Sequence, residues 1–96
     1  MSLDSQDLLQ TAIAHQKSGR IDQAEALYRQ VIRDDPRNSD ALHLLGVVAI
    51  QKGHPGNGAE LISQAIKLNR TAALYHSNRG MANRMLGRAE AAIRDF

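Results

Sequence analysis

Four histidines are the residues of this sequence with the most evident chemical potential, namely His15, His43, His54 and His76. Imidazole binds zinc where several ligands converge, and a helix achieves this with ligands close in sequence, as in the HExxH pattern. Here the four histidines stand far apart, no such pattern occurs, and no cysteine is present to supply thiolates. We therefore expect neither a metal site nor a cofactor.

A glycine-rich segment at 53–58, Gly-His-Pro-Gly-Asn-Gly, superficially resembles a loop that wraps a phosphate. A phosphate loop follows a strand, opens a helix and includes a Lys-Ser or Lys-Thr pair. This segment joins two helical patterns and lacks that pair. No Ser-His-Asp set or pair of catalytic carboxylates stands out from the helix-surface charges either. We therefore predict that the chain is not an enzyme.

Charge, aromatic content and hydropathy limit the classes of partner. The formal net charge is +2 and aromatic residues make up 3% of the chain, whereas binding of single-stranded nucleic acid needs dense basic groups and stacking aromatics. The basic excess in 49–96 fits either solvated helix faces or an acidic partner. The longest apolar run, 44–50, is too short to cross a bilayer. We predict no nucleic-acid partner and no membrane partner.

The N-terminus and the lack of cysteine indicate a cellular compartment. No basic region followed by an apolar stretch opens the sequence, so no secretion signal is visible. A chain without cysteine fits a reducing environment. We therefore expect a cytoplasmic protein.

Residues of similar size return every 34 positions along the chain. A fixed period of this length is typical of a repeat architecture, in which stacked units build an extended surface. The recurring positions are glycine at Gly19, Gly53 and Gly87, small residues at Ala12, Gly46, Gly80 and at Ala24, Gly58, Ala92, and bulky residues at Tyr28, Ile62 and Phe96.

Apolar spacing between these positions predicts helices. Asp4 or Ser5 can cap the first, and Asn38 or Ser39 the third. Gly19 ends the first helix in the left-handed conformation that glycine tolerates, and Gly53 ends the third helix. The chain stops inside the sixth helix, as an excised fragment of a longer array would. The predicted spans are roughly 5–18, 21–34, 40–52, a fourth that opens at Pro55 and contains Leu68, 72–86, and a sixth beginning near residue 88 or 89.

The pattern resembles the tetratricopeptide repeat, a 34-residue helix–turn–helix unit, over nearly the whole chain. We place the repeats at 5–38, 39–72 and, in part, 73–96. Residues that match the family's signature are Leu8, Ala12, Gly19, Ala24, Tyr28 and Pro36, then Leu42, Leu45, Gly46, Gly53 and Ala65, then Gly80, Gly87, Ala92 and Phe96. Departures from it are Thr11, His15 and Val31, then Gly58, Ile62 and Arg70, then His76, Arg79 and Asn83.

The resemblance implies an all-α fold, a right-handed superhelix of helix pairs in one domain of fewer than three repeats. In the family, the first helix of each repeat lines a concave groove. This register assigns the groove to Leu9, Ile13, Lys17, His43, Val47, Ile50, Asn78, Met81 and Arg84. Its middle is apolar, which is typical of a contact surface, unless some of these side chains pack against neighbouring helices.

The resemblance also implies a function, which is to hold a protein or peptide partner on a non-catalytic scaffold. Some relatives bind peptide carboxylates with paired Lys and Asn residues, but the matching positions here carry Leu9, Ile13, His43 and Val47. Others bind extended peptides with an asparagine ladder. Only Asn78 fits that ladder, since Gln10 is a partial substitute and Leu44 breaks it. We expect neither device.

Two further hypotheses stay open. The segment 41–46, Ala-Leu-His-Leu-Leu-Gly, followed by the long repeat, resembles bacterial N-terminal arrays fused to glycosyltransferase, sulfotransferase or methyltransferase domains. The chain would then recruit a substrate for chemistry located beyond Phe96. Alternatively, an uncapped terminal helix can drive self-association or a swap of helices, through apolar residues at Ala89, Ala92, Ile93 and Phe96.

Overall fold

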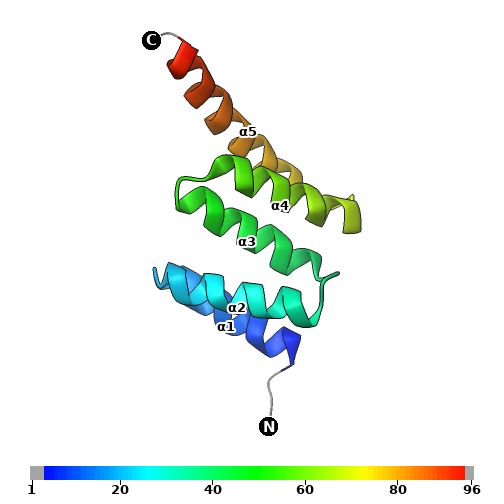
Figure 1. Cartoon of the computed structure of the whole chain (residues 1–96). Coiled ribbons are helices and arrows are strands. Elements are labelled where there is room, and N and C mark those ends of the chain that lie inside the picture. Colours follow the sequence, from blue (N-terminus) through cyan, green and yellow to red (C-terminus); the bar gives the residue numbers. More distant parts are fainter. Residues whose placement is uncertain (1–3, 95–96) are drawn as a thin grey trace.

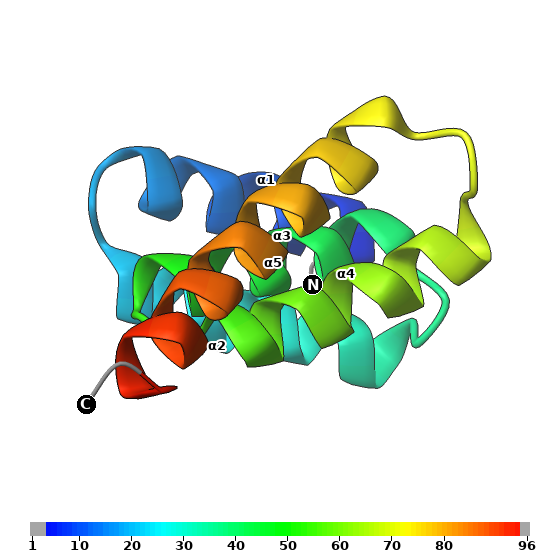
Figure 2. The same ribbon diagram turned by 90° about the horizontal axis from the view of Figure 1, so that it is seen from above.

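The computed structural model describes residues 4–94 of the chain, with side chains as far as residue 90. Consecutive helices in this range fold back on one another and stack into an elongated body (Figure 1). Seen from above, α1 lies on one side of the stack, α2 and α4 lie on the other, and α5 crosses obliquely (Figure 2). Within the described range the helices are α1 (Ser5–Lys17), α2 (Ile21–Asp34), α3 (Ser39–Gln51), α4 (Pro55–Leu68) and α5 (Ala73–Arg94).

The helix boundaries follow from the capping residues that the sequence provides. The Asp4 carboxylate accepts a hydrogen bond from the backbone N–H of Asp7 at 2.8 Å, and the Asn38 side chain accepts one from Ala41 at 3.0 Å. Both bonds satisfy N–H groups that a helix start leaves without partners. Gly19 and Gly53 follow α1 and α3 with φ of 81° and 86°, respectively. The predicted caps and stops of these two helices are confirmed.

The C-terminal part differs from the sequence prediction. We expected a break near Gly87 between two helices, but α5 continues through that glycine to Arg94. Glycine lowers helix stability by only about 1 kcal/mol relative to alanine, and the strong helix formers Arg88, Ala89 and Glu90 follow it. After Gly53, by contrast, a proline two residues later prevents the helix from continuing.

The core consists of two apolar clusters that share α3. The first joins α1, α2 and α3 around Tyr28 and Val48, and the second joins α3, α4 and α5 around Ile62. Tyr28 and Ile62, which recur at the same repeat position, are fully buried, as the bulky series predicts. Phe96, the third member of that series, lies outside the described residues. So do the side chains of Ala92 and Ile93, on which the predicted self-association depends.

Two glycines let α3 and α4 approach until their backbones touch. A Cβ atom on Gly46 would lie 2.7 Å from Ile62 Cγ1 and 2.9 Å from the carbonyl oxygen of Gly58. A Cβ atom on Gly58 would in turn lie 2.6 Å from Ile50 Cγ1 and 2.8 Å from the carbonyl oxygen of Gly46. No side chain fits at either position without displacing its neighbours. Gly80, at the position equivalent to Gly46, would bring its Cβ near only the Arg84 guanidinium, at 3.7 Å.

Candidate functional site

The residues predicted to line the groove fall into three classes of exposure. Lys17, Met81 and Arg84 are exposed, and Ile13, Val47 and Asn78 are half-buried. The expected exposure of the other three is wrong, because Leu9 packs into the first core cluster, Ile50 packs into the second cluster above Gly58, and His43 is covered by α5. The alternative, that some of these side chains pack against neighbouring helices, holds for Leu9, His43 and Ile50.

His43 is buried where α3 meets α5. Its side chain is 3% exposed, and its ring stacks on that of Tyr75 with centroids 4.5 Å apart. The amide nitrogen of Asn78 lies 2.9 Å from its Nε2, so that when the amide donates, the imidazole is neutral with its proton on Nδ1. Burial lowers the pKa of His43, and the nearby Asp40 carboxylate opposes that shift. The ring therefore supports the α3–α5 contact as a neutral group.

Tyr75 completes this polar contact through its hydroxyl group. Its hydroxyl donates to the carboxylate of Asp40 and lies 3.3 Å from Ser39 Oγ. Burial, followed by the hydrogen bond to Asp40, raises the pKa of Tyr75. On the same face of α5, the Asn78 amide nitrogen contacts His43, so one of its hydrogen-bonding groups belongs to the α3–α5 contact.

A matching bridge joins α1 to α3. The Gln16 amide donates to Gln51 Oε1 at 3.0 Å, and the Tyr28 hydroxyl donates to Gln16 Oε1 at 2.6 Å. Burial raises the pKa of Tyr28 to about 12, so the hydroxyl keeps its proton at neutral pH. Tyr28 thus orients the glutamine that connects the two first helices of successive repeats.

These cross-repeat bonds were missed in the sequence, although a signal for them exists. Gln16 and Gln51, Asp40 and Tyr75, and His43 and Asn78 are all separated by 35 positions. This separation is one repeat plus one residue. Polar residues that are 35 positions apart therefore identify where the first helices of successive repeats contact each other.

One apolar surface that stays accessible is a strip across α1, α3 and α5. Ile13, Val47 and Met81 occupy the same position in successive repeats, 34 residues apart, and Met81 is 38% exposed. Lys17 and Arg84 are exposed about one helical turn further along α1 and α5, respectively. Such a strip can bury apolar side chains of another chain, with cations beside it to attract acidic groups.

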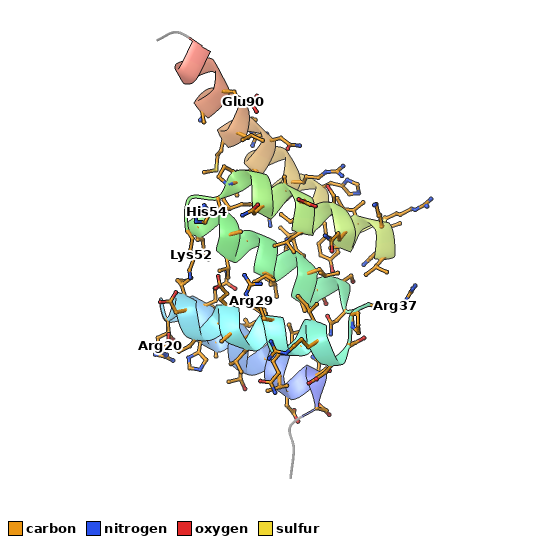
Figure 3. All side chains as sticks on the ribbon, viewed as in Figure 1. Arg20, Arg29, Arg37, Lys52, His54 and Glu90 are labelled. Carbon is orange, nitrogen blue, oxygen red and sulfur yellow. The ribbon has the colours of Figure 1, made fainter. Side chains whose placement is uncertain are left out.

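The histidines do not converge in the structure. His15 Nδ1 accepts from Arg20 Nε at 2.8 Å, His76 Nε2 lies 2.9 Å from the Arg70 carbonyl oxygen, and His54 lies in the turn before α4 (Figure 3). Among the residues described, no three His, Cys, Asp or Glu side chains are grouped to hold a metal ion. No helix between residues 4 and 94 combines the length and apolarity needed to cross a membrane.

Comparison with known proteins agrees with the repeat pattern in the sequence. Residues 9–55 and 44–96 match the model of the tetratricopeptide repeat family. No curated protein gives a significant match in sequence. The all-α repeat fold predicted from the sequence is confirmed by the helical structure and by its similarity to solved repeat structures.

Three solved structures illustrate this similarity. The first TPR of Spaghetti (RPAP3), bound to the HSP90 peptide SRMEEVD, has a TM-score of 0.84 and 23% identity, covering 96% of this chain and 73% of that one. An O-GlcNAc transferase of Thermobaculum terrenum has a TM-score of 0.79 and 34% identity over 85% of this chain, but only 16% of its own length. The MamA protein has a TM-score of 0.78 and 27% identity, over 94% and 49% of the two chains.

Proposed function

Because this chain belongs to the tetratricopeptide repeat family, we propose that it is a non-catalytic module that binds a peptide segment of a partner protein. The binding surface is the strip of Ile13, Val47 and Met81 on α1, α3 and α5. The observation that carries the proposal is that these three equivalent residues stay partly exposed, whereas their neighbours Leu9 and Ile50 are buried. A repeated apolar position left open to solvent is typical of a contact surface.

The chemistry of the strip favours an apolar peptide over one held by its terminal carboxylate. A relative in fold binds the peptide SRMEEVD, which is rich in acidic residues. In this chain, the positions that match the family's carboxylate-binding Lys and Asn residues carry apolar side chains and a buried histidine. Met81 adds a flexible side chain that adapts to varied apolar partners. We expect aliphatic or aromatic anchors in the bound segment.

The test is a selection of peptides from a displayed random library on the parent chain, followed by binding to variants. Val47→Glu and Met81→Glu place a carboxylate in the strip and are expected to abolish binding of the selected apolar peptides. Ala26→Glu, on an exposed position of α2, is the matched control and is expected to bind them unchanged. If no selected peptide binds Val47→Glu and Met81→Glu more weakly than the parent, the proposed strip is refuted.

A second candidate function is recruitment of a protein substrate for a larger enzyme. It is supported by the 34% identity to a segment of an O-GlcNAc transferase, of which this chain matches only a small part. The coding sequence beyond the codon for Phe96 tests this idea. A catalytic domain there favours the recruiting role, and that enzyme's substrates then become the binding probes. A stop codon after further repeats favours a free-standing adaptor.

A further inference from the structure

A cleft lies between α2 and α4, on the face of α3 opposite to Val47. Its volume is about 310 Å³, its floor is formed by Leu42 and Leu45 of α3, and its walls include Ile32 of α2 and Leu61 of α4. A second hollow of about 240 Å³ shares Leu61 and continues along α4. Together they form a trough with an apolar floor, which we call the α2–α4 cleft. The volume of the first hollow is at the lower end of the range for ligand sites, and it is enough for one or two inserted side chains.

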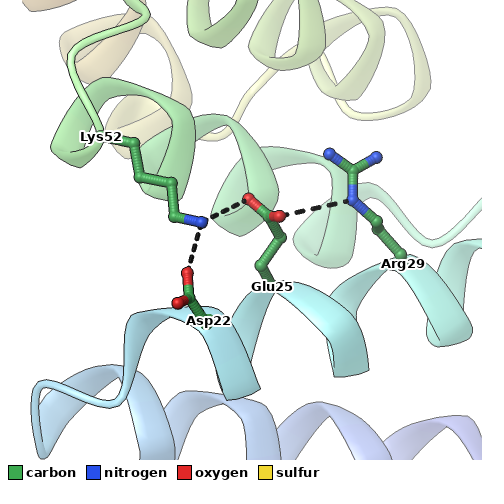
Figure 4. A network of polar contacts seen from close by, with 4 residues as sticks. All are labelled: Asp22, Glu25, Arg29 and Lys52. Atoms are coloured by element: carbon green, nitrogen blue, oxygen red, sulfur yellow. Dashed lines mark hydrogen bonds and ion pairs between the residues drawn. The ribbon is translucent and has the colours of Figure 1, made fainter.

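The rim of the cleft on α2 is positively charged. Arg29 and Arg33 lie one helical turn apart on α2, and both line the cleft. The Arg29 side chain is 58% exposed, and its ion pair with Glu25 is long, at 3.8 Å. Glu25 is also shared with Lys52 at 3.3 Å (Figure 4). Within the described part of the chain Arg33 makes no ion pair, so its guanidinium donors are available to an incoming carboxylate.

The opposite rim on α4 is polar and carries one carboxylate, that of Glu60. Gln64 faces Arg29 and Arg33 across the cleft, and Asn57 and Glu60 line the second hollow. The cleft as a whole therefore combines an apolar floor with a cationic wall and a wall of hydrogen-bonding groups. Each guanidinium can bind a carboxylate through two parallel N–H···O bonds.

We propose that the α2–α4 cleft is a second docking site, which binds a peptide segment with an apolar side chain flanked by Asp or Glu. The apolar side chain inserts between Ile32 and Leu61 above the α3 floor, and the acidic residues reach Arg29 and Arg33. Charge complementarity identifies this occupant, because an uncharged apolar peptide leaves Arg33 without an ion pair and Arg29 with only its long contact to Glu25. This site is separate from the strip on α1, α3 and α5 and does not depend on it.

Two other anionic partners fit the cleft less well. Nucleic acid binds through dense positive charge and aromatic stacking, yet within residues 4–90 no aromatic residue lines the cleft, and its two arginines are its only cations. An anionic membrane attracts a broad cationic surface, whereas Asp22 and Glu25 flank the arginines on α2. A peptide side chain, in contrast, fits the apolar floor between the helices.

The experiment uses the same displayed peptide library on the whole chain, with variants that remove the cationic rim. The double variant Arg29→Gln and Arg33→Gln is compared with Arg37→Gln and Arg70→Gln, which removes equal charge from exposed positions outside the cleft. Peptides that pair acidic with apolar residues are expected to be enriched on the parent. Their affinity should fall about tenfold in the cleft variant and stay unchanged in the control, with weaker binding at high salt.

Amide chemical shifts recorded with a selected peptide locate the site. Changes are expected around Arg29, Ile32 and Leu61, and the same peptide should bind the Val47→Glu variant unchanged, which separates this site from the strip. The proposal is overturned if acidic–apolar peptides are not enriched, if the cleft variant binds them like the parent, or if the shifts cluster at Ile13, Val47 and Met81. Equal displacement of the peptide by a short oligonucleotide or by anionic lipid vesicles would also overturn it.

Discussion

Helices α3 and α4 touch through their backbones, whereas a Cβ atom on either glycine of α5 would meet no atom closer than 3.7 Å. At the first contact, a Cβ on Gly46 would meet the Gly58 carbonyl oxygen at 2.9 Å. On α5, a Cβ on Gly87 would meet nothing within 4 Å. This difference indicates that a small residue is required at a repeat position only where a second helix packs directly against it. Elsewhere the same residue is a local weakness of the helix.

Helices α4 and α5 are also held to α3 by different kinds of interaction. The α3–α4 contact is formed by Gly46, Gly58 and the buried Ile62, and is therefore one of close apolar packing. The start of α5 is held by packing together with the polar contact of His43, Tyr75 and Asp40. The stability of the α3–α4 contact should therefore depend on side-chain volume, and the stability of the α3–α5 contact should depend on pH as well.

The largest expected effect comes from adding one methyl group to the α3–α4 contact. In Gly46→Ala, the new Cβ would clash with Ile62 and with a backbone carbonyl that cannot rotate away. Overpacking of a core costs about 1–3 kcal/mol, which exceeds the gain in helix propensity of up to about 1 kcal/mol. We expect a net loss of about 1–2 kcal/mol in the free energy of unfolding, measured by urea denaturation.

The matched control for this prediction is Gly80→Ala, at the equivalent position on α5. Its Cβ would meet only the flexible Arg84 guanidinium at an ordinary contact distance of 3.7 Å. The control should therefore be neutral or stabilising. Equal destabilisation by the two substitutions would break the comparison, because glycine would then serve the same role in both regions.

Lowering the pH is expected to reduce the stability of the protein by a smaller amount, through the α3–α5 contact. Burial holds the pKa of His43 below its ordinary value, so the unfolded chain takes up a proton before the folded chain does. The stabilising contribution of the neutral ring is complete above about pH 6.5 and is lost as the pH falls toward the lower pKa of the folded state. Urea denaturation at pH values from 7.5 down to 5 measures this loss.

The variant His43→Phe keeps a ring against Tyr75 but cannot take up a proton. Its stability should change less with pH than that of the parent over the same range, although it loses the bond to Asn78. The groups that face His43 are Asp40 on its own helix and Tyr75 and Asn78 on α5, and of these Asp40 favours the protonated ring. Parallel pH curves for parent and variant would show that His43 does not carry the effect.

Sequence periodicity predicted the features that are decided within a single repeat. Gly19 and Gly53 end helices, Asn38 caps α3, and Tyr28 and Ile62 fill the core, because each depends on local geometry or on one helix pair. The exposure of the groove residues was predicted less well, because it depends on how closely the next helix packs.

His43 and Asn78 illustrate why the rest was missed. The family register assigns both to an open groove, but their side chains bind each other across α3 and α5. Repeat position alone specifies which helix face a residue lies on. Whether that face meets solvent depends on the residue 35 positions away, on the first helix of the next repeat. Alignment of successive repeats compares residues that are 34 positions apart, so it does not reveal a contact between residues that are 35 apart. The binding role of the groove residues stays a prediction.

The smallest effect concerns Gly87 of α5, the helix whose C-terminal part extends past α4 (Figure 1). Alanine there gains helix propensity of up to about 1 kcal/mol and meets no atom within 4 Å, so Gly87→Ala should stabilise α5 as a continuous helix. The gain should appear as slower amide hydrogen exchange at residues 84–90, with little change in α1 to α4. If Gly87 instead marks a turn into a returning helix, alanine at a left-handed position would cause strain, and exchange in this segment would become faster.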